Sequence, residues 1–240
     1  MSKADNSGTT VILVAGAFHT GFHTAPAARS IEQAGYNVVS CAPFTELTIA
    51  SMANAADMIE SAINDELQKG QQICLVLHSM AARPGCEALI RIISKNGTAR
   101  ESIKSLVMVA AFLTTNPADL PSLMNGDIET DPAKGVSTVK DPAYLFYNDM
   151  EPAATQPFVD AIQPLVHYAP LELSSELYKT IPGAYLFCEK DNIVPPSLQT
   201  IEADASGLSV VRLDTGHCPF VSQPELFVQT IDNVIAGSRG

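Results

Sequence analysis

Six short apolar runs divide the chain, and longer segments with apolar residues at helical spacing separate most of them. An unbroken apolar run is typical of a strand that is buried on both faces of a parallel sheet. Helices are expected after the third strand and from Pro224 onward, where Ser222-Gln223-Pro224-Glu225 has the form of a capping box. Strands that alternate with helices predict an α/β fold, with a mostly parallel sheet and helices on both faces. The predicted strands cover 11–14, 36–40, 73–77, 105–113, 183–188 and 208–213, and further helices 24–35 and 48–69.

The segment from Thr114 to Thr180 breaks this alternation. It contains many prolines and no clean strand pattern. A structureless loop of this length is uncommon inside a compact domain, so we predict a small, mostly helical insertion that covers part of the molecule. The chain, residues 1–240, is then expected to be a single domain with a helical cap at about 114–180.

Composition limits the class of protein and its partners. Hydrophobic residues make up 46% of the chain, which suits a globular protein with a sizeable core. The longest apolar runs are far shorter than the roughly 18 residues that a membrane helix needs. The polar start from Met1 to Thr9 lacks the apolar core of a secretory signal. A formal net charge of -12 argues against nucleic acid as a partner. We therefore expect a cytoplasmic protein that binds neither nucleic acid nor membranes.

Cysteine and histidine spacing predicts no metal site. The 5 cysteines are an odd number without a CxxC pair, which indicates reduced, structural thiols. No HxxxH pattern lies on a predicted helix, and no Cys/His cluster has the spacing of metal ligands. Neither GxGxxG nor GxxxxGK follows the first strand, so a phosphate-binding loop is not expected there.

The stretch from Ile73 to Ala82 marks the passage from the third strand into a helix, with His78 and Ser79 at the junction. A serine on such a sharp turn has its hydroxyl pushed beyond the sheet, where a base can reach it. Serine is a weak nucleophile at neutral pH and needs that base, which a third group must hold. Ser79 is therefore the candidate nucleophile.

Two later strands end in groups that fit the remaining roles. Asp191 follows the fifth strand and His217 follows the sixth, so both are expected at the same sheet edge as Ser79. Glu189 and Asp214 are also carboxylates at this edge, and Asp214 could orient His217 instead of Asp191. We favour Asp191 as the acid, since that group usually comes from the loop after the preceding strand.

An acyl-transfer site also needs two N–H groups for the oxyanion. One is expected from Met80, directly after the nucleophile. The other should come from the loop after the first strand, where Gly16 permits close backbone approach. Ala17 is therefore the predicted second donor.

Four motifs carry a resemblance to a known family: Val11 to His19, His78-Ser79-Met80, Asp191 with Val194-Pro195-Pro196, and Gly216-His217 with Pro219-Phe220. From about Val11 to Ile235 the chain resembles the α/β-hydrolase superfamily, and its small branch of fungal and bacterial hydrolases related to plant methylesterases and hydroxynitrile lyases. The chain order Ser, Asp, His is the one expected of that fold. The resemblance implies a Ser-His-Asp hydrolase with a helical cap that acts on small esters or related carbonyl compounds without a cofactor.

Two motifs depart from the family's usual form. The usual elbow is Gly-x-Ser-x-Gly, but Leu77 and Ala81 stand at the glycine positions here. The usual His-Gly of the first loop is Ala15-Gly16. Alanine is small enough for the elbow, whereas leucine is bulkier and could tilt the turn.

The predicted function is a serine hydrolase that cleaves small carboxylic esters through an acyl-enzyme. The same triad could instead serve a lactonase, a hydroxynitrile-lyase-like enzyme or a polyketide-tailoring enzyme, or be quiet in a small-ligand binder. The oligomeric state is open, with a homodimer among the alternatives.

Some further side chains are candidates for the substrate pocket. His19 and His23 follow the first loop, and the alternative role for both is hydrogen bonding within that loop. His78 is expected to support the elbow rather than act as the base, because it is adjacent to Ser79. Phe146 and Tyr147 are expected to pack within the insertion, although aromatic residues of such a cap also line apolar pockets. The candidates are Phe18, His19, His23, His78, Phe146 and His167.

Overall fold

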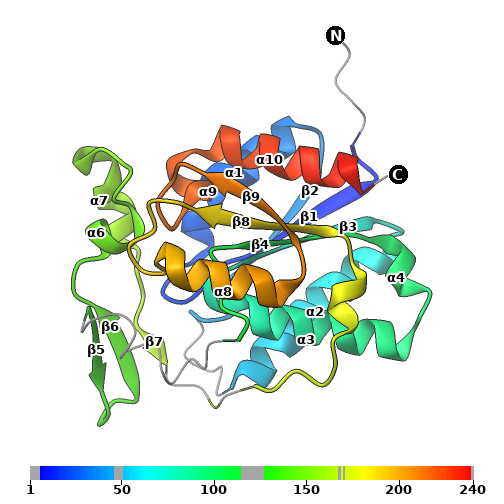
Figure 1. Cartoon of the computed structure of the whole chain (residues 1–240), viewed down its shortest axis with the longest axis horizontal. Helices are drawn as coiled ribbons and strands as arrows, with labels where there is room; N and C mark the ends of the chain where they lie inside the picture. The colour runs from blue at the N-terminus through cyan, green and yellow to red at the C-terminus, as the bar shows by residue number, and fades with distance from the viewer. Residues whose placement is uncertain (1–5, 46–50, 115–126, 167–168, 170, 239–240) are drawn as a thin grey trace.

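The computed structural model of the protein describes residues 6–45, 51–114, 127–166, 169 and 171–238. A six-stranded parallel sheet with the order β2-β1-β3-β4-β8-β9 forms its centre (Figure 1). Both faces of β1 and β3 are buried, and for this reason each of these strands is an unbroken apolar run in the sequence. The strands are β1 (Thr9–Val14), β2 (Asn37–Cys41), β3 (Gln72–His78), β4 (Ile103–Val109), β8 (Gly183–Cys188) and β9 (Ser209–Leu213).

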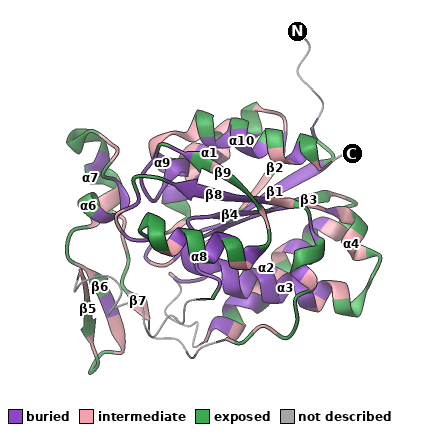
Figure 2. Cartoon of the chain, viewed as in Figure 1, coloured by how far each residue is buried: buried purple, intermediate pink, exposed green. Residues whose placement is uncertain are grey.

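Helices cover both faces of this sheet, and buried residues gather on the strands and on the helix faces turned toward them (Figure 2). The predicted α/β architecture is therefore confirmed. None of the helices in the described ranges is long and apolar enough to cross a membrane. One layer holds α1 (Gly21–Gln33), α9 (Pro219–Ser222) and α10 (Pro224–Gly237), and the other holds α2 (Met52–Gln68), α3 (Ala82–Lys95) and α8 (Pro196–Ser206). Shorter helices are η1 (Ser79–Ala81), α4 (Ala99–Ser102) and η3 (Leu177–Thr180).

The order in which strands are added to the sheet reverses after β2. Strand β2 lies on one side of β1, whereas β3, β4, β8 and β9 follow in order on the other side. The loops that leave the carboxyl ends of β1 and β3 therefore diverge, and open α/β sheets bind ligands at such a switch point. Gly16 and Ser79 lie in these two loops.

The insertion is partly different from its prediction. It contains helices α6 (Pro142–Phe146) and α7 (Pro152–Asp160), as expected, but also a three-stranded antiparallel sheet in the order β5-β6-β7. The expectation of a mostly helical insertion is wrong in this respect. Strands β5 (Ile128–Asp131), β6 (Val136–Val139) and β7 (Leu165–Val166) are short and mostly not buried, so they lack the apolar alternation that predicts a strand. Helices α6 and α7 and strands β5 to β7 lie at the left of Figure 1, beyond the end toward which β8 points.

The capping box predicted at Ser222 is also wrong. Ser222 is the last residue of α9, and its hydroxyl donates to Asp149 Oδ2 at 2.8 Å. Helix α10 begins at Pro224 after Gln223, which forms no side-chain cap. Proline does stand in the first turn, where its missing N–H costs little.

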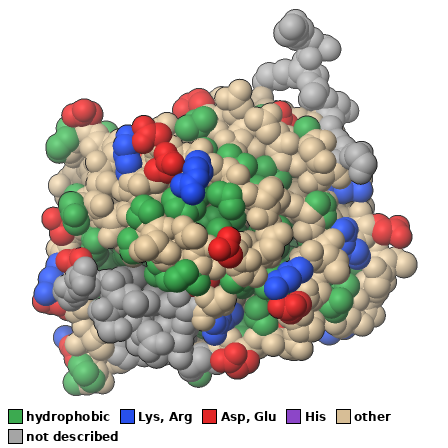
Figure 3. Space-filling model, in the orientation of Figure 1, with side chains coloured by type: hydrophobic (Ala, Val, Ile, Leu, Met, Phe, Trp, Pro, Cys, Tyr) green, Lys and Arg blue, Asp and Glu red, His purple; other side chains and the backbone are tan. Residues whose placement is uncertain are grey.

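Strand β9 forms one edge of the sheet. Strand β9 and helix α8 lie on the side of the molecule drawn in Figure 3, where hydrophobic and charged side chains alternate on the surface. Val210 of β9 and Ile201 of α8 are exposed. Arg212 of β9 lies 4.2 Å from the centroid of the Phe187 ring and pairs with Glu189. A charged side chain on an edge strand discourages pairing with another chain.

The bulk of Leu77 at the elbow is accommodated by a glycine in α3. A Cβ atom placed on Gly85 would lie 2.3 Å from Leu77 Cδ2 and 2.6 Å from Cδ1. The leucine side chain therefore fills the space that Gly85 leaves, and it is fully buried. Gly85, in the first turn of α3, therefore compensates for the leucine at the elbow.

We predict that Gly85→Ala destabilises the protein by about 1–3 kcal/mol through overpacking, although alanine is the better helix former. In a Leu77→Ala background the clash is gone, and the same Gly85→Ala change should be neutral or stabilising. Urea unfolding of the four proteins in this double-mutant cycle measures the coupling. Strictly additive effects would show that the two side chains do not share this space.

Candidate active site

Ser79 occupies the turn between β3 and η1, and its backbone has a left-handed conformation. Its φ is 54°, a value that residues with a side chain rarely adopt and that costs on the order of 1–3 kcal/mol. Ser79 is 6% exposed. Its carbonyl accepts a hydrogen bond from Phe112 N–H at 3.1 Å, so the loop after β4 supports the turn.

Gly16 brings the loop after β1 into contact with this turn. Strands β1 and β3 pair in register, with Val14 opposite Leu77. A Cβ atom on Gly16 would lie 2.7 Å from Ser79 Cβ and 2.9 Å from His78 O. Only glycine fits there, because this position needs close approach of two backbones.

The two predicted oxyanion donors border this contact. Ala17 follows Gly16, and its N–H has no acceptor among the described residues. Met80 is in the first turn of η1, where N–H groups lack an intrahelical acceptor. Both groups are therefore available to a ligand beside Ser79.

Two histidines hold the first loop from opposite sides. His78 Nδ1 accepts from Gly16 N–H at 3.2 Å, which leaves its Nε2–H to donate to His217 O at 3.2 Å. His19 Nδ1–H donates to Ala17 O at 2.7 Å. Its Nε2 lies 3.2 Å from Cys218 Sγ, and burial raises the pKa of that thiol, so the S–H is the donor. His78 thus supports the elbow, as expected.

Asp191 and His217 are brought together, as the sequence predicts. His217 Nδ1–H donates to Asp191 Oδ2 at 2.7 Å, and the two residues are 1% and 4% exposed. Asp191 Oδ1 accepts from the N–H groups of Ile193 and Val194, both at 2.8 Å. The carboxylate is thereby fixed in its loop, and His217 Nε2 is left without a proton and can act as a base.

The alternative carboxylates face elsewhere. Asp214 pairs with Lys190 at 2.8 Å, and its side chain is 73% exposed. Glu189 lies 3.5 Å from Arg212 at the surface. Of the three carboxylates considered at this edge, Asp191 is the one that contacts His217.

The structure forms no hydrogen bond between Ser79 and His217 within its described ranges. His78, the residue directly before Ser79, does contact His217, and the centroids of the two rings are 4.5 Å apart. Serine–imidazole hydrogen bonds are often long in the absence of substrate. Asp191 and His217 are therefore joined directly, whereas Ser79 is linked to His217 through its neighbour His78, whose Nε2–H donates to His217 O.

Gln199 supports the loop that carries Asp191, and sequence reasoning did not find it. Its Nε2–H₂ donates to Cys188 O and Val194 O, both at 2.8 Å, while Oε1 accepts from Cys188 N–H at 2.9 Å. A glutamine in α8 carries no motif, since only its burial and its partners identify the role.

Phe146 brings the insertion into contact with His217. Its ring centroid is 5.6 Å from His217, 5.9 Å from Phe18 and 4.8 Å from His19. These four rings are buried together, so Phe146 does more than pack within the insertion.

His23 is turned toward α7 and caps α1. Its Nδ1 accepts from Thr20 N–H at 2.9 Å, and its Nε2–H donates to Phe158 O at 3.0 Å. Both ring nitrogens of His19 and of His23 are therefore engaged in hydrogen bonds. His167, the remaining pocket candidate, lies outside the described residues.

Burial keeps the supporting histidines neutral. The pKa of His19 is well below 6.5 because of burial and the nearby His23. The pKa of His78 is well below 6.5 because of burial and then the nearby His217 and His19. Burial also lowers the pKa of His23. A neutral His78 is what the loop requires, since a protonated ring could not accept the Gly16 N–H.

Other features of the described chain carry no catalytic group. No cluster of three or more His, Cys, Asp or Glu side chains could hold a metal ion in the part that the structure describes. The 5 cysteines are all free, as predicted.

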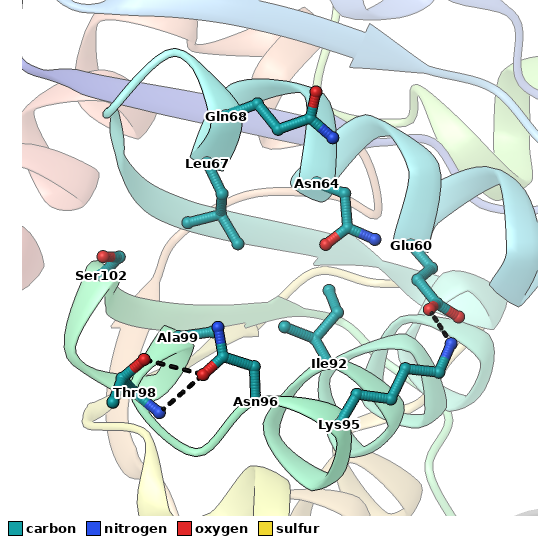
Figure 4. A pocket seen from close by; sticks show the side chains of 10 residues that line it. All are labelled: Glu60, Asn64, Leu67, Gln68, Ile92, Lys95, Asn96, Thr98, Ala99 and Ser102. Carbon is teal, nitrogen blue, oxygen red and sulfur yellow. Dashed lines mark hydrogen bonds and ion pairs between the residues drawn. The ribbon is translucent and has the colours of Figure 1, made fainter.

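A pocket of about 380 Å³ lies between α2 and the segment from the end of α3 to α4, where Lys95 pairs with Glu60 at 2.6 Å (Figure 4). One of the residues that line it is Ser102, directly before β4 begins. The pocket therefore lies at the amino-terminal ends of the parallel strands, whereas Ser79 lies at their carboxyl ends.

We predict that Gly16→Ala lowers kcat/KM for a test ester about 100- to 1000-fold, the loss expected when one oxyanion donor is misplaced. The added methyl group must push the loop away from Ser79. Gly21→Ala is the matched control, because no atom lies within 4 Å of the added Cβ there. Equal activity of the two variants would contradict the close-contact role of Gly16.

We also predict that stability falls as the pH drops below about 6.5, the usual pKa of histidine in an unfolded chain. The unfolded chain then binds protons that buried His19 and His78 do not, so the free energy of unfolding decreases. Between pH 7.5 and 5.5 each histidine that stays neutral costs about 1.4 kcal/mol, or roughly 3 kcal/mol for both. Urea unfolding at the two pH values measures this. In His19→Gln the loss should shrink by about 1.4 kcal/mol, and an unchanged loss would disprove the assignment.

The chain matches the alpha/beta hydrolase family over residues 11–230. It is 30% identical over 208 residues to the probable hydrolase R7 of Phoma sp., with 81% of each chain covered. A pyrethroid hydrolase from Sphingobium faniae has a similar fold, with a TM-score of 0.70, 18% identity and coverage of 95% of this chain and 97% of that one. For polyneuridine aldehyde esterase the TM-score is 0.74, with 15% identity and coverage of 95% and 99%. The chain therefore belongs to the alpha/beta hydrolase family.

Proposed function

We propose that the protein is a serine hydrolase that cleaves small carboxylic esters by two-step acyl transfer. The observation that carries the proposal is the buried hydrogen bond of 2.7 Å between His217 Nδ1 and Asp191 Oδ2, at the carboxyl ends of the strands, where Ser79 directly follows β3. With Nδ1–H donating to Asp191, Nε2 of the neutral ring can accept a proton, and the strained turn of Ser79 lies at the same end of the sheet. These groups support nucleophilic catalysis better than metal or phosphate chemistry.

In the first step Ser79 Oγ attacks the ester carbonyl while His217 Nε2 takes the hydroxyl proton. His217 then gives that proton to the leaving alcohol, and the acyl group stays on Ser79. In the second step His217 takes a proton from water, which attacks the acyl-enzyme. The imidazolium then returns that proton to Ser79 Oγ as the bond to the acyl group breaks, so the acid is released and the free enzyme is restored. Asp191 holds the ring and stabilises the imidazolium in both steps.

The N–H groups of Ala17 and Met80 are proposed to stabilise the oxyanion in each tetrahedral intermediate. Both come from segments whose backbones are already fixed, through the contacts of Gly16 with His78 and of Phe112 with Ser79. Donors that need no reorganisation during the reaction stabilise the developing charge most effectively.

The rings around His217 favour an uncharged, apolar substrate. Phe146 and His78 lie nearest, and His78 is neutral. An ionised carboxylate of a substrate would lose water there without gaining a cationic partner from these rings. Polyneuridine aldehyde esterase and the pyrethroid hydrolase share the fold, which by itself does not fix the reaction.

We predict that Ser79→Ala abolishes covalent labelling by a fluorophosphonate and lowers turnover of p-nitrophenyl butyrate by roughly five to six orders of magnitude. Intact-protein mass spectrometry measures the labelling, and a panel of esters, lactones and cyanohydrins identifies the reaction. An unlabelled wild-type protein that still binds a small ligand tightly would favour the binder instead. Product formation only from lactones or cyanohydrins would move the proposal to that chemistry.

The acid is tested by a pair of matched variants in the same assay. Asp191→Asn should lower kcat about 10⁴-fold, because the amide favours the wrong tautomer of His217. Asp214→Asn removes a carboxylate from the same sheet edge and should leave kcat within about twofold, as expected for a surface ion pair. A larger loss from Asp214→Asn would reverse the assignment of the acid.

A further inference from the structure

The segment of the insertion from Tyr144 to Asp149 is bonded to the loop of Asp191. Asn148 Nδ2–H donates to Lys190 O at 2.8 Å, one residue before the acid. Asn192 Nδ2–H donates to Tyr144 O at 2.9 Å, one residue after it. The insertion is therefore hydrogen-bonded to the residues on both sides of Asp191.

Asp149 makes the corresponding contacts on both sides of His217. Its Oδ2 accepts from Gly216 N–H at 2.8 Å, directly before His217, and from Ser222 Oγ–H at 2.8 Å, at the end of α9. One carboxylate oxygen thus ties together the two chain segments that flank the base.

Gly216 is shaped for this contact. A Cβ atom placed on Gly216 would lie 2.4 Å from Asn148 Oδ1 and 2.8 Å from Asp149 Oδ1. The glycine therefore permits the close approach of the insertion to the His217 loop, and a side chain at this position would separate them.

One polar atom in this contact between Asp149 and the His217 loop lacks a hydrogen-bond partner. Asp149 Oδ1 is buried, and it has no hydrogen-bond partner among the described residues. An unpaired buried oxygen costs free energy, so local stability alone does not account for a carboxylate here. Polar groups that are costly in this way are typical of functional sites.

We propose that Asp149 is a positioning residue that holds His217 in line with Asp191 and makes the base depend on the docked insertion. This inference rests on the proposed function. Phe146 completes the arrangement, because its ring lies against His217 from the same segment. Removal of Asp149 frees the backbone before His217, whereas Asp191 keeps its own bonds to Ile193 and Val194.

The test compares Asp149→Ala, Asp149→Asn and Asp141→Ala in the full chain. The asparagine oxygen can still accept from Gly216 and Ser222, so Asp149→Asn should stay within about threefold of the wild-type kcat. Asp149→Ala should lower kcat for p-nitrophenyl butyrate about 10- to 100-fold, with KM within about threefold, as expected for a misplaced base. Asp141 accepts from Tyr144 N–H as the cap of α6, so its loss weakens the same insertion without touching His217.

Proton NMR adds a readout that does not depend on turnover. The low-field resonance of the His217 Nδ1–H bonded to Asp191 should broaden or vanish in Asp149→Ala and remain in the other two variants. An Asp149→Ala protein with wild-type kcat and an intact resonance would overturn the proposal. So would an Asp141→Ala protein that loses as much activity as Asp149→Ala, since general melting of the insertion would then explain both.

The experiment also distinguishes misfolding of Asp149→Ala and failure of the proposed function from failure of the present proposal. If Asp149→Ala does not fold, Ser222→Ala removes one of the two donors and should lower kcat about three- to tenfold; an unchanged kcat would count against the proposal. If the wild-type protein is not labelled by the fluorophosphonate, the proposed function fails. The resonance then decides alone whether Asp149 positions His217.

Discussion

Burial fixes the geometry of this site, because a polar atom removed from water must find its partner within the protein. Asp191 and His217 are almost completely buried, and so are His19 and His78. Each ring nitrogen of His19 and His78 has a partner, and Asp191 uses both of its oxygens. A side chain held in this way loses its conformational freedom when the protein folds rather than when substrate binds. The site is thereby preorganised before substrate arrives.

The hydrogen bonds join four loops in a continuous series that a parallel sheet makes possible. Gly16 after β1 bonds to His78 at the end of β3, and His78 bonds to the carbonyl of His217 after β9. The His217 ring in turn bonds to Asp191 after β8. These loops meet because all four strands point the same way, and Ser79 follows β3 at the point where the strand order reverses. Loss of any one bond therefore affects two loops.

Sequence reasoning found the parts of the site that follow from strand pattern and residue type. Ser79, Asp191 and His217 stand at strand ends, so the fold and the contact between Asp191 and His217 could be predicted. The contacts of Gln199 and Asp149 could not. Gln199 bonds to backbone groups of the nearby loop without any motif, and Asp149 bonds to Gly216 and Ser222, which are distant in the sequence. The departure at Leu77 was recognised, but its compensation by Gly85 appears only when β3 packs on α3.

The insertion and its contact with Ser222 also could not be predicted from local sequence patterns. Strands β5 and β6 pair through short segments that are mostly not buried, which leave no apolar pattern to detect. Ser222 has the local pattern of a helix cap, yet its hydroxyl donates to Asp149. At Ser222 a contact with a distant segment outweighs the local preference.

The insertion contacts the loops of both Asp191 and His217, and this restricts how the protein could change its substrate. The contacts come from the segment from Tyr144 to Asp149, so substitutions there are expected to alter the positions of Asp191 and His217. Strands β5 to β7 are mostly not buried and pair with one another. Changes in these strands can reshape the cover with less effect on His217. Selectivity is therefore expected to vary in the outer part of the insertion, while the segment beside His217 stays constrained by its hydrogen bonds.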